Sequence, residues 1–113
     1  MPVKHRHPIA DLFDLLGRRW ALRVLWELRD EPVPYRRLRE RCDEVSTSVL
    51  ATRLRELTAA GIVEQADGGY ALTRSGHELL DHLRPLNDWA KKRLRTPSGG
   101  PASAQHVRAS GTL

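Results

Sequence analysis

The sequence predicts a mainly α-helical fold that carries one small β-hairpin. Between Pro34 and Thr73, two stretches of helical periodicity flank a short polar turn, and two β-prone stretches follow around Asp67-Gly68. Apolar residues also recur at helical spacing before Pro34 and after Thr73. Helix, turn, helix and hairpin in this order make a winged helix-turn-helix, expected here as a three-helix core plus a long C-terminal helix.

The first two helices are predicted from apolar spacing. The first is expected over residues 9–16, after Pro8, which suits a helix start. Gly17 is expected to end it in the C′ position, where glycine readily becomes left-handed. The second helix is expected over residues 19–29 and is apolar on nearly every side, so it should be the buried central helix of the domain.

The next two helices form the predicted helix-turn-helix. The third helix is expected over residues 35–42 and the turn at Asp43-Glu44-Val45. Ser46 is a good N-cap for the fourth helix, because its hydroxyl can accept a hydrogen bond from a free backbone N–H group. Gly61 can adopt the left-handed conformation that ends that helix.

The hairpin and the last helix complete the domain. Strands are expected over residues 63–65 and 70–72, with Asp67-Gly68 as a turn in which both positions have positive φ. Val33, between two prolines, is expected as a short edge strand. Thr73 should cap a helix over residues 74–94, and Pro85 should kink it.

The length and the composition are typical of one small domain that binds a polyanion. The 113 residues divide into a basic, flexible arm (1–7), the domain with its dimerisation helices (8–94) and a disordered tail rich in Pro, Ser, Gly and Ala (95–113). The net charge of +5 and the pI of about 10.1 favour nucleic-acid binding. One cysteine and the lack of a long apolar run indicate a cytoplasmic protein without a membrane segment.

The fourth helix has the two faces that a DNA-reading helix needs. Leu50, Leu54 and Leu57 share one face, and the opposite face is small or polar. Arg55 can bond guanine in bidentate fashion, and Thr52 can meet a base edge or a thymine methyl group. Backbone N–H groups at the helix start can bind phosphate. The predicted DNA-binding residues are Arg36, Arg37, Ser46, Thr47, Ser48, Thr52, Arg53 and Arg55, with Arg53 on the flank and assigned to phosphate.

Over residues 7–94 the chain resembles HxlR-type transcriptional regulators, a branch of the winged helix-turn-helix repressors close to the MarR group. The resemblance rests on the His7-to-Gly17 segment with Arg19-Trp20, on the segment 46–63, on Tyr70-Ala71-Leu72-Thr73 with Gly76, and on Asp88-Trp89. It implies a cytoplasmic homodimer that binds double-stranded DNA at an inverted-repeat operator, most simply as a repressor. It also implies a dimer interface built by the first and last helices.

The apolar faces of those two helices exceed what one small core needs, which agrees with dimerisation. The expected interface residues are Ile9, Leu12, Phe13, Leu79, Leu83, Leu86 and Trp89. The alternative, that both faces pack on the second helix of the same chain, stays open.

Two departures from the family pattern change its implications. His7 stands where the family has a cysteine that serves some members as a thiol sensor, and Cys42 is expected to be a small core residue, so sensing by the usual thiol is not expected. The hairpin is short and its tip, Asp67-Gly68-Gly69, has no basic residue, so DNA contacts by the hairpin are not expected either.

The remaining sequence patterns do not indicate a metal, catalytic or cofactor site. His5 and His7, and separately Glu78 and His82, make poor metal sites, and no catalytic or cofactor motif is present, so we expect no enzyme activity, metal or cofactor. Core packing is the favoured interpretation of Trp20, Trp26 and Trp89, although they could line a pocket for a small aromatic effector. The alternative function is a winged-helix protein-interaction module without specific DNA binding.

Overall fold

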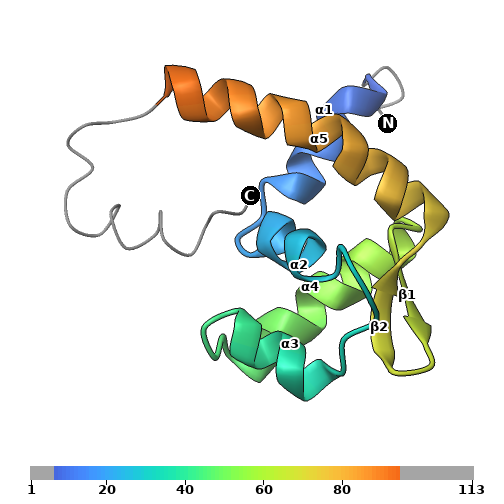
Figure 1. Cartoon of the computed structure of the whole chain (residues 1–113). Coiled ribbons are helices and arrows are strands. Elements are labelled where there is room, and N and C mark those ends of the chain that lie inside the picture. The colour runs from blue at the N-terminus through green and yellow to red at the C-terminus, as the bar shows by residue number, and fades with distance from the viewer. Residues whose placement is uncertain (1–6, 95–113) are drawn as a thin grey trace.

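The computed structural model describes residues 7–94, which form five helices and an antiparallel hairpin (Figure 1). The elements follow in the order α1 (Pro8–Leu16), α2 (Ala21–Glu27), α3 (Tyr35–Arg41), α4 (Thr47–Ala59), β1 (Val63–Ala66), β2 (Gly69–Leu72) and α5 (Arg74–Arg93). The predicted fold class is therefore confirmed. The predicted tail and, apart from His7, the predicted basic arm lie outside the described residues.

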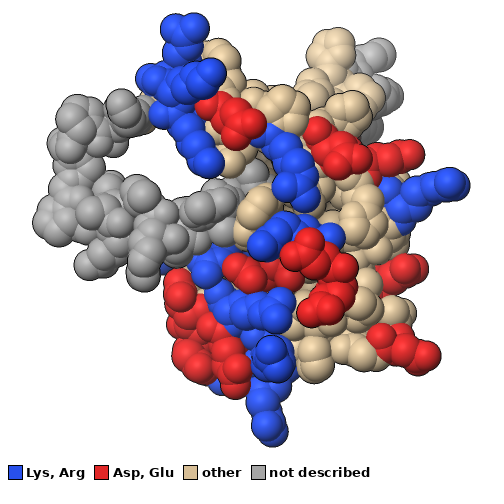
Figure 2. Space-filling model, viewed as in Figure 1, with Lys and Arg blue, Asp and Glu red and all other residues tan. Residues whose placement is uncertain are grey.

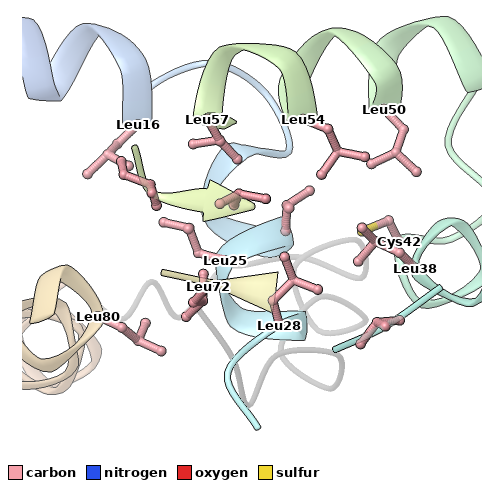
Figure 3. Close-up of a cluster of buried hydrophobic side chains, with 14 of the residues drawn as sticks. Leu16, Leu25, Leu28, Leu38, Cys42, Leu50, Leu54, Leu57, Leu72 and Leu80 are labelled. Carbon is pink, nitrogen blue, oxygen red and sulfur yellow. The ribbon is translucent and has the colours of Figure 1, made fainter. Parts of the chain in front are cut away.

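Helix α2 and its C-cap Leu28 form the centre of the core, as expected. Val24, Leu25 and Leu28 are at most 1% exposed. Figure 3 shows leucines from the surrounding elements converging on this centre. They are Leu16, Leu38, Leu50, Leu54, Leu57, Leu72 and Leu80. Each fully buried leucine contributes roughly 1.5–3 kcal/mol, so the helix-turn-helix and α5 are held to α2 mainly by apolar burial.

The turn between α1 and α2, residues 17–20, differs from the prediction. Helix α2 begins at Ala21 rather than at Arg19, because Trp20 is its N-cap and has a left-handed φ of 76°. Gly17 ends α1 but is not left-handed, since its φ is −78°. The left-handed residue of this turn is thus a tryptophan, which the sequence could not indicate because bulky side chains rarely adopt this conformation.

The helix-turn-helix has the predicted boundaries to within a residue. Cys42 is the C-cap of α3, and Ser46 caps α4 by accepting a hydrogen bond from the Val49 backbone N–H at 3.2 Å. Gly61 follows α4 with a φ of 77°, which confirms its left-handed role. The predicted cap and stop signals therefore define the bounds of α4 correctly.

Strands β1 and β2 pair with Val63 opposite Leu72 and Ala66 opposite Gly69. The turn conformation expected at Asp67-Gly68 is wrong in one respect: the left-handed residues are Gly68 and Gly69, and Asp67 is not among the residues with positive φ. The predicted edge strand at Val33 is confirmed as a two-bond bridge to Tyr70. This bridge requires glycine at position 69, because a Cβ atom there would overlap the Val33 carbonyl.

Helix α5 is attached to the hairpin by its first turn. The Thr73 hydroxyl accepts a hydrogen bond from the Gly76 N–H at 3.0 Å and donates to the Gly61 carbonyl at 2.6 Å. Gly76 lies so close to the Ile62 carbonyl that a Cβ atom would overlap it. The helix continues past Pro85, the site of the predicted kink, to Arg93. None of the described helices is long and apolar enough to cross a membrane.

Candidate DNA interface

Helix α4 has the two faces that the sequence predicted. Leu50 and Leu57 are fully buried and Leu54 is 3% exposed, so this face is committed to the core. On the opposite face Ser48, Arg55 and Ala59 are exposed, and Thr52 is half-buried. This polar face can approach a DNA groove without the helix giving up any core contact.

Arg55 and Thr52 form a pair on the polar face. The Arg55 Nη2 atom donates a hydrogen bond to the Thr52 Oγ1 atom at 3.2 Å. Arg55 remains exposed, so its other guanidinium donors are free to meet a base edge. The bond favours one direction of this long side chain, and such preorganisation reduces the conformational entropy lost on contact.

The start of α4 carries three side chains with hydroxyl groups. Ser46, Thr47 and Ser48 are all exposed, and the helix is long enough for its first backbone N–H groups to attract phosphate. The Ser46 hydroxyl is the N-cap and lies 3.5 Å from the Ser48 hydroxyl. The Tyr35 hydroxyl donates to the Thr47 carbonyl oxygen at 3.1 Å, which ties the start of α3 to the start of α4.

The arginines of α3 divide into two groups. Arg36 and Arg37, the predicted phosphate contacts, are exposed near the start of the helix. Arg39 and Arg41 are partly buried and bonded within the chain. The Arg39 Nε atom donates to the Val45 carbonyl oxygen at 2.7 Å, and Arg41 Nη1 donates to the Glu27 carbonyl oxygen at 3.4 Å. Only the first pair is therefore free to reach a DNA backbone.

The turn of the helix-turn-helix contains two consecutive left-handed residues, Asp43 (φ 58°) and Glu44 (φ 59°). This conformation costs roughly 1–2 kcal/mol for each residue that has a Cβ atom. Arg39 offsets the cost, because its Nη1 atom lies 3.6 Å from a Glu44 carboxylate oxygen in addition to the bond to Val45. Arg23 supports the chain just before the turn, because its Nη2 atom donates a hydrogen bond to the Arg41 carbonyl oxygen at 2.6 Å. Sequence reasoning missed these supporting roles.

Arg53 lies in a different environment from the other predicted DNA-binding residues. Its side chain is only 16% exposed. The Nη1 atom donates to Glu56 Oε1 at 2.6 Å and the Nε atom donates to the Arg19 carbonyl oxygen at 2.9 Å. To contact a phosphate, as the sequence suggested, Arg53 would have to release both bonds.

The hairpin beside α4 offers no basic side chain. A shallow groove of about 540 Å³ runs between the helix and the hairpin. It is lined by Leu54, Arg55, Thr58, Ala59, Glu64, Gln65 and Tyr70. Figure 2 shows basic side chains over α3 and at the end of α5, and acidic side chains both beside α3 and on the side of the hairpin. The absence of Lys and Arg from residues 63–72 agrees with the expectation that the hairpin makes no DNA contacts.

Helices α1 and α5 lie away from α3 and α4 (Figure 1), and both carry exposed apolar side chains. We call these side chains the α1–α5 apolar surface, and its most exposed members are Ile9 (54%), Phe13 (58%), Leu86 (52%), Trp89 (52%) and Leu94 (64%). Leu12, Leu79 and Leu83 lie beside it, partly buried against the core. Leu94, the C-cap of α5, was not among the predicted interface residues and is also exposed.

The three tryptophans have different roles. Trp20 and Trp26 pack against the core, and Trp26 is also covered by Arg29 and Arg84, whose guanidinium carbons lie 4.1 and 5.2 Å from the ring centre. Trp89 is half exposed, so the interpretation of this residue as core packing is wrong. Its position instead suits the α1–α5 apolar surface.

Cys42, the C-cap of α3, is fully buried. Burial away from water raises the pKa of its thiol to about 11, although the nearby Arg23 charge acts in the opposite direction. A thiol with a raised pKa is a poor nucleophile at neutral pH. Among the described residues, no group of three His, Cys, Asp or Glu side chains could hold a metal ion.

Comparisons with known proteins agree with this geometry. The profile of the HxlR-like helix-turn-helix family matches residues 15–97. The chain is 32% identical over 85 residues to the HTH-type transcriptional regulator YodB of Bacillus subtilis, covering 69% of this chain and 76% of YodB. It is 26% identical over 93 residues to an uncharacterized HTH-type transcriptional regulator of Halalkalibacterium halodurans, covering 75% and 82% of the two chains.

Solved structures are similar as well. Quinone-bound YodB from B. subtilis superposes with a TM-score of 0.70 at 32% identity, covering 74% of this chain and 96% of that chain. The reduced form of YodB gives a TM-score of 0.72 at 28% identity, covering 80% and 96%.

Proposed function

Because the chain belongs to the HxlR-like helix-turn-helix family of transcriptional regulators, we propose that it binds double-stranded DNA at an inverted-repeat operator as a homodimeric, cytoplasmic repressor. The observation that carries the proposal is the exposed polar face of α4, where Arg55 is held by Thr52 opposite a fully buried leucine face. A helix with these two faces is suited to reading bases in the major groove.

The proposed contacts fall into two classes. Arg55 and Thr52 read base edges. The remaining contacts are made to the phosphates on either side of the major groove, and they hold α4 in register on the DNA. They come from Arg36, Arg37, Ser46, Thr47 and Ser48.

Dimerisation is supported by the α1–α5 apolar surface. Five large apolar side chains are more than half exposed there, and an isologous interface would cover them in both subunits. The interface we propose consists of Ile9, Leu12, Phe13, Leu79, Leu83, Leu86 and Trp89, extended by Leu94. To enter successive major grooves of one DNA face, the two α4 helices of a two-fold dimer would lie about 34 Å apart, one turn of DNA, and a dimer bound in this way would occlude a promoter.

A small aromatic effector is the ligand class to test first, because the similar protein YodB has been solved with a quinone bound. In this chain the one cysteine, Cys42, is buried with a raised pKa. We therefore propose that any such ligand binds without forming a bond to a thiol.

Selection of binding sites from a random duplex DNA library tests the proposed function. We expect enrichment of a two-fold symmetric motif with half-sites one helical turn apart. Binding without any motif would contradict the proposal and would favour the alternative, a protein-interaction module with a short acidic hairpin.

A further inference from the structure

A polar junction connects the recognition helix to the turn that follows α1. Arg53 of α4 donates to the Arg19 carbonyl oxygen at 2.9 Å through Nε and to Glu56 Oε1 at 2.6 Å through Nη1. The Arg18 Nε atom lies 3.7 Å from the same Glu56 oxygen. One arginine and one glutamate thus bind both the backbone and a side chain of the 17–20 turn.

The junction differs from the ordinary ion pairs of a protein surface. The Arg53 and Glu56 side chains are 16% and 28% exposed, so water competes less for their charges than at an open surface. The guanidinium group also donates in two directions at once, which fixes its orientation. By contrast Arg55, two residues further along α4, is exposed on the opposite side of the helix.

The turn that the junction holds is itself constrained. Trp20 adopts a left-handed backbone conformation, which persists in a bulky residue only where its surroundings impose it. The Arg53 bond to the adjacent carbonyl of Arg19 and the packing of Trp20 against the core are two such constraints. The direction in which α1 leaves the core therefore depends on contacts made by α4.

Helix α1 carries part of the α1–α5 apolar surface, including Phe13 at 58% exposure. If this surface meets the partner subunit, the angle between α1 and α4 sets the distance between the two recognition helices of the dimer. We propose that Arg53 and Glu56 are positioning residues that fix this distance and so determine which half-site spacing the dimer prefers. The inference rests on the proposed function.

The test compares a duplex containing one selected half-site with duplexes containing two half-sites at different spacings. One half-site engages one recognition helix, whereas two half-sites require both helices at the correct separation. We use Arg53→Lys, which keeps the positive charge but cannot reproduce the two-directional contact, and Glu56→Gln, which removes the acceptor charge.

We expect both variants to bind the single half-site within about twofold of wild type and to lose about fivefold or more on the preferred full site, in the range typical of network substitutions. Their preference for that spacing over spacings one base pair longer or shorter should flatten. The double variant should lose less than the two single effects combined, because both substitutions break one junction.

Asp30→Asn is the matched control, since it removes one acidic charge from the exposed Asp30, which pairs with Arg29 and is not part of the junction. It should keep the wild-type spacing preference. Thermal unfolding of each variant identifies losses that arise from instability, and the spacing ratio is independent of the fraction of folded protein.

Three outcomes would overturn the inference. Equal losses on half-site and full site would make the two residues direct contacts or general stabilisers. An unchanged Arg53→Lys protein would favour a phosphate contact that lysine can replace. If wild type bound no spaced repeat at all, the proposed function would fail together with the inference, whereas the first two outcomes leave that function intact.

Discussion

Phe13→Ala tests whether the α1–α5 apolar surface is a dimer interface. Phe13 is 58% exposed in the single chain and is not part of the core cluster, so its loss should leave the fold intact. Aromatic side chains bury about 150–250 Å² when covered, which leaves roughly 110 Å² of Phe13 for a partner to cover. At about 25 cal/mol per Å², and allowing for the contact that alanine keeps, this area is worth about 2 kcal/mol.

An isologous interface contains the side chain twice, so Phe13→Ala should weaken the dimer by about 4 kcal/mol. This corresponds to a dissociation constant roughly a thousandfold higher. Sedimentation equilibrium over a wide concentration range measures that constant directly. Far-UV circular dichroism and thermal unfolding should show that the variant subunit is folded.

Glu78→Ala is the control for this experiment, because Glu78 is exposed on α5 but contributes no apolar area. It should dimerise as wild type does. A Phe13→Ala protein whose dimer constant stays within about threefold of wild type would refute the reasoning, since roughly 110 Å² of apolar area on each subunit would then be left uncovered in the dimer.

Four further predictions follow from the site and the core. Arg55→Ala should cost about 1–3 kcal/mol on the selected DNA and relax specificity at one base pair of each half-site, measured by anisotropy; equal loss on random DNA would make Arg55 a phosphate contact. Arg36→Ala should weaken binding to all sequences and lower the slope of log K against log salt by about one; an unchanged slope would remove it from the phosphate contacts. Gly76→Ala should destabilise the fold by about 2 kcal/mol or more in urea titrations, since its Cβ atom would overlap the Ile62 carbonyl, whereas the exposed neighbour in Ser75→Ala should have little effect. The Cys42 thiol should react slowly with alkylating reagents in the folded protein, because a pKa of about 11 leaves only about a thousandth of it ionised at pH 8; rapid labelling under native conditions would contradict this.

The sequence predicted helix α4 well because the signals that define it are local. Ser46, the leucine spacing and Gly61 act within a few residues of the helix that they define. The same periodicity also placed Arg55 and Thr52 on the polar face, where the structure has them.

The sequence could not separate the arginines that support the fold from those left free. Arg53 bonds to the carbonyl of a residue 34 positions earlier, and a backbone carbonyl leaves no mark in the sequence. Arg39 similarly supports a turn whose left-handed Asp43 and Glu44 are not glycines. These roles depend on tertiary geometry rather than on local pattern.

The sequence also failed to indicate which residues of the turns have positive φ angles. Gly17 ends α1 as expected, but the left-handed residue of this turn is Trp20, because tertiary packing overrides local preference there. In the hairpin, the positive φ angles fall on Gly68 and Gly69, where the chain passes close to Val33. The close approach of the hairpin turn to Val33, which is distant in sequence, therefore determines which residues of this turn have positive φ.

The central claim is that α4 reads bases from the major groove in a two-fold arrangement. Methylation interference on the selected duplex tests this claim most directly. Dimethyl sulfate modifies guanine N7 in the major groove and adenine N3 in the minor groove, so one experiment distinguishes the grooves. We predict two symmetric clusters of interfering guanine N7 positions about one helical turn apart, with the strongest position in each cluster lost in Arg55→Ala. Interference confined to adenine N3, or no interference at any base, would contradict the account.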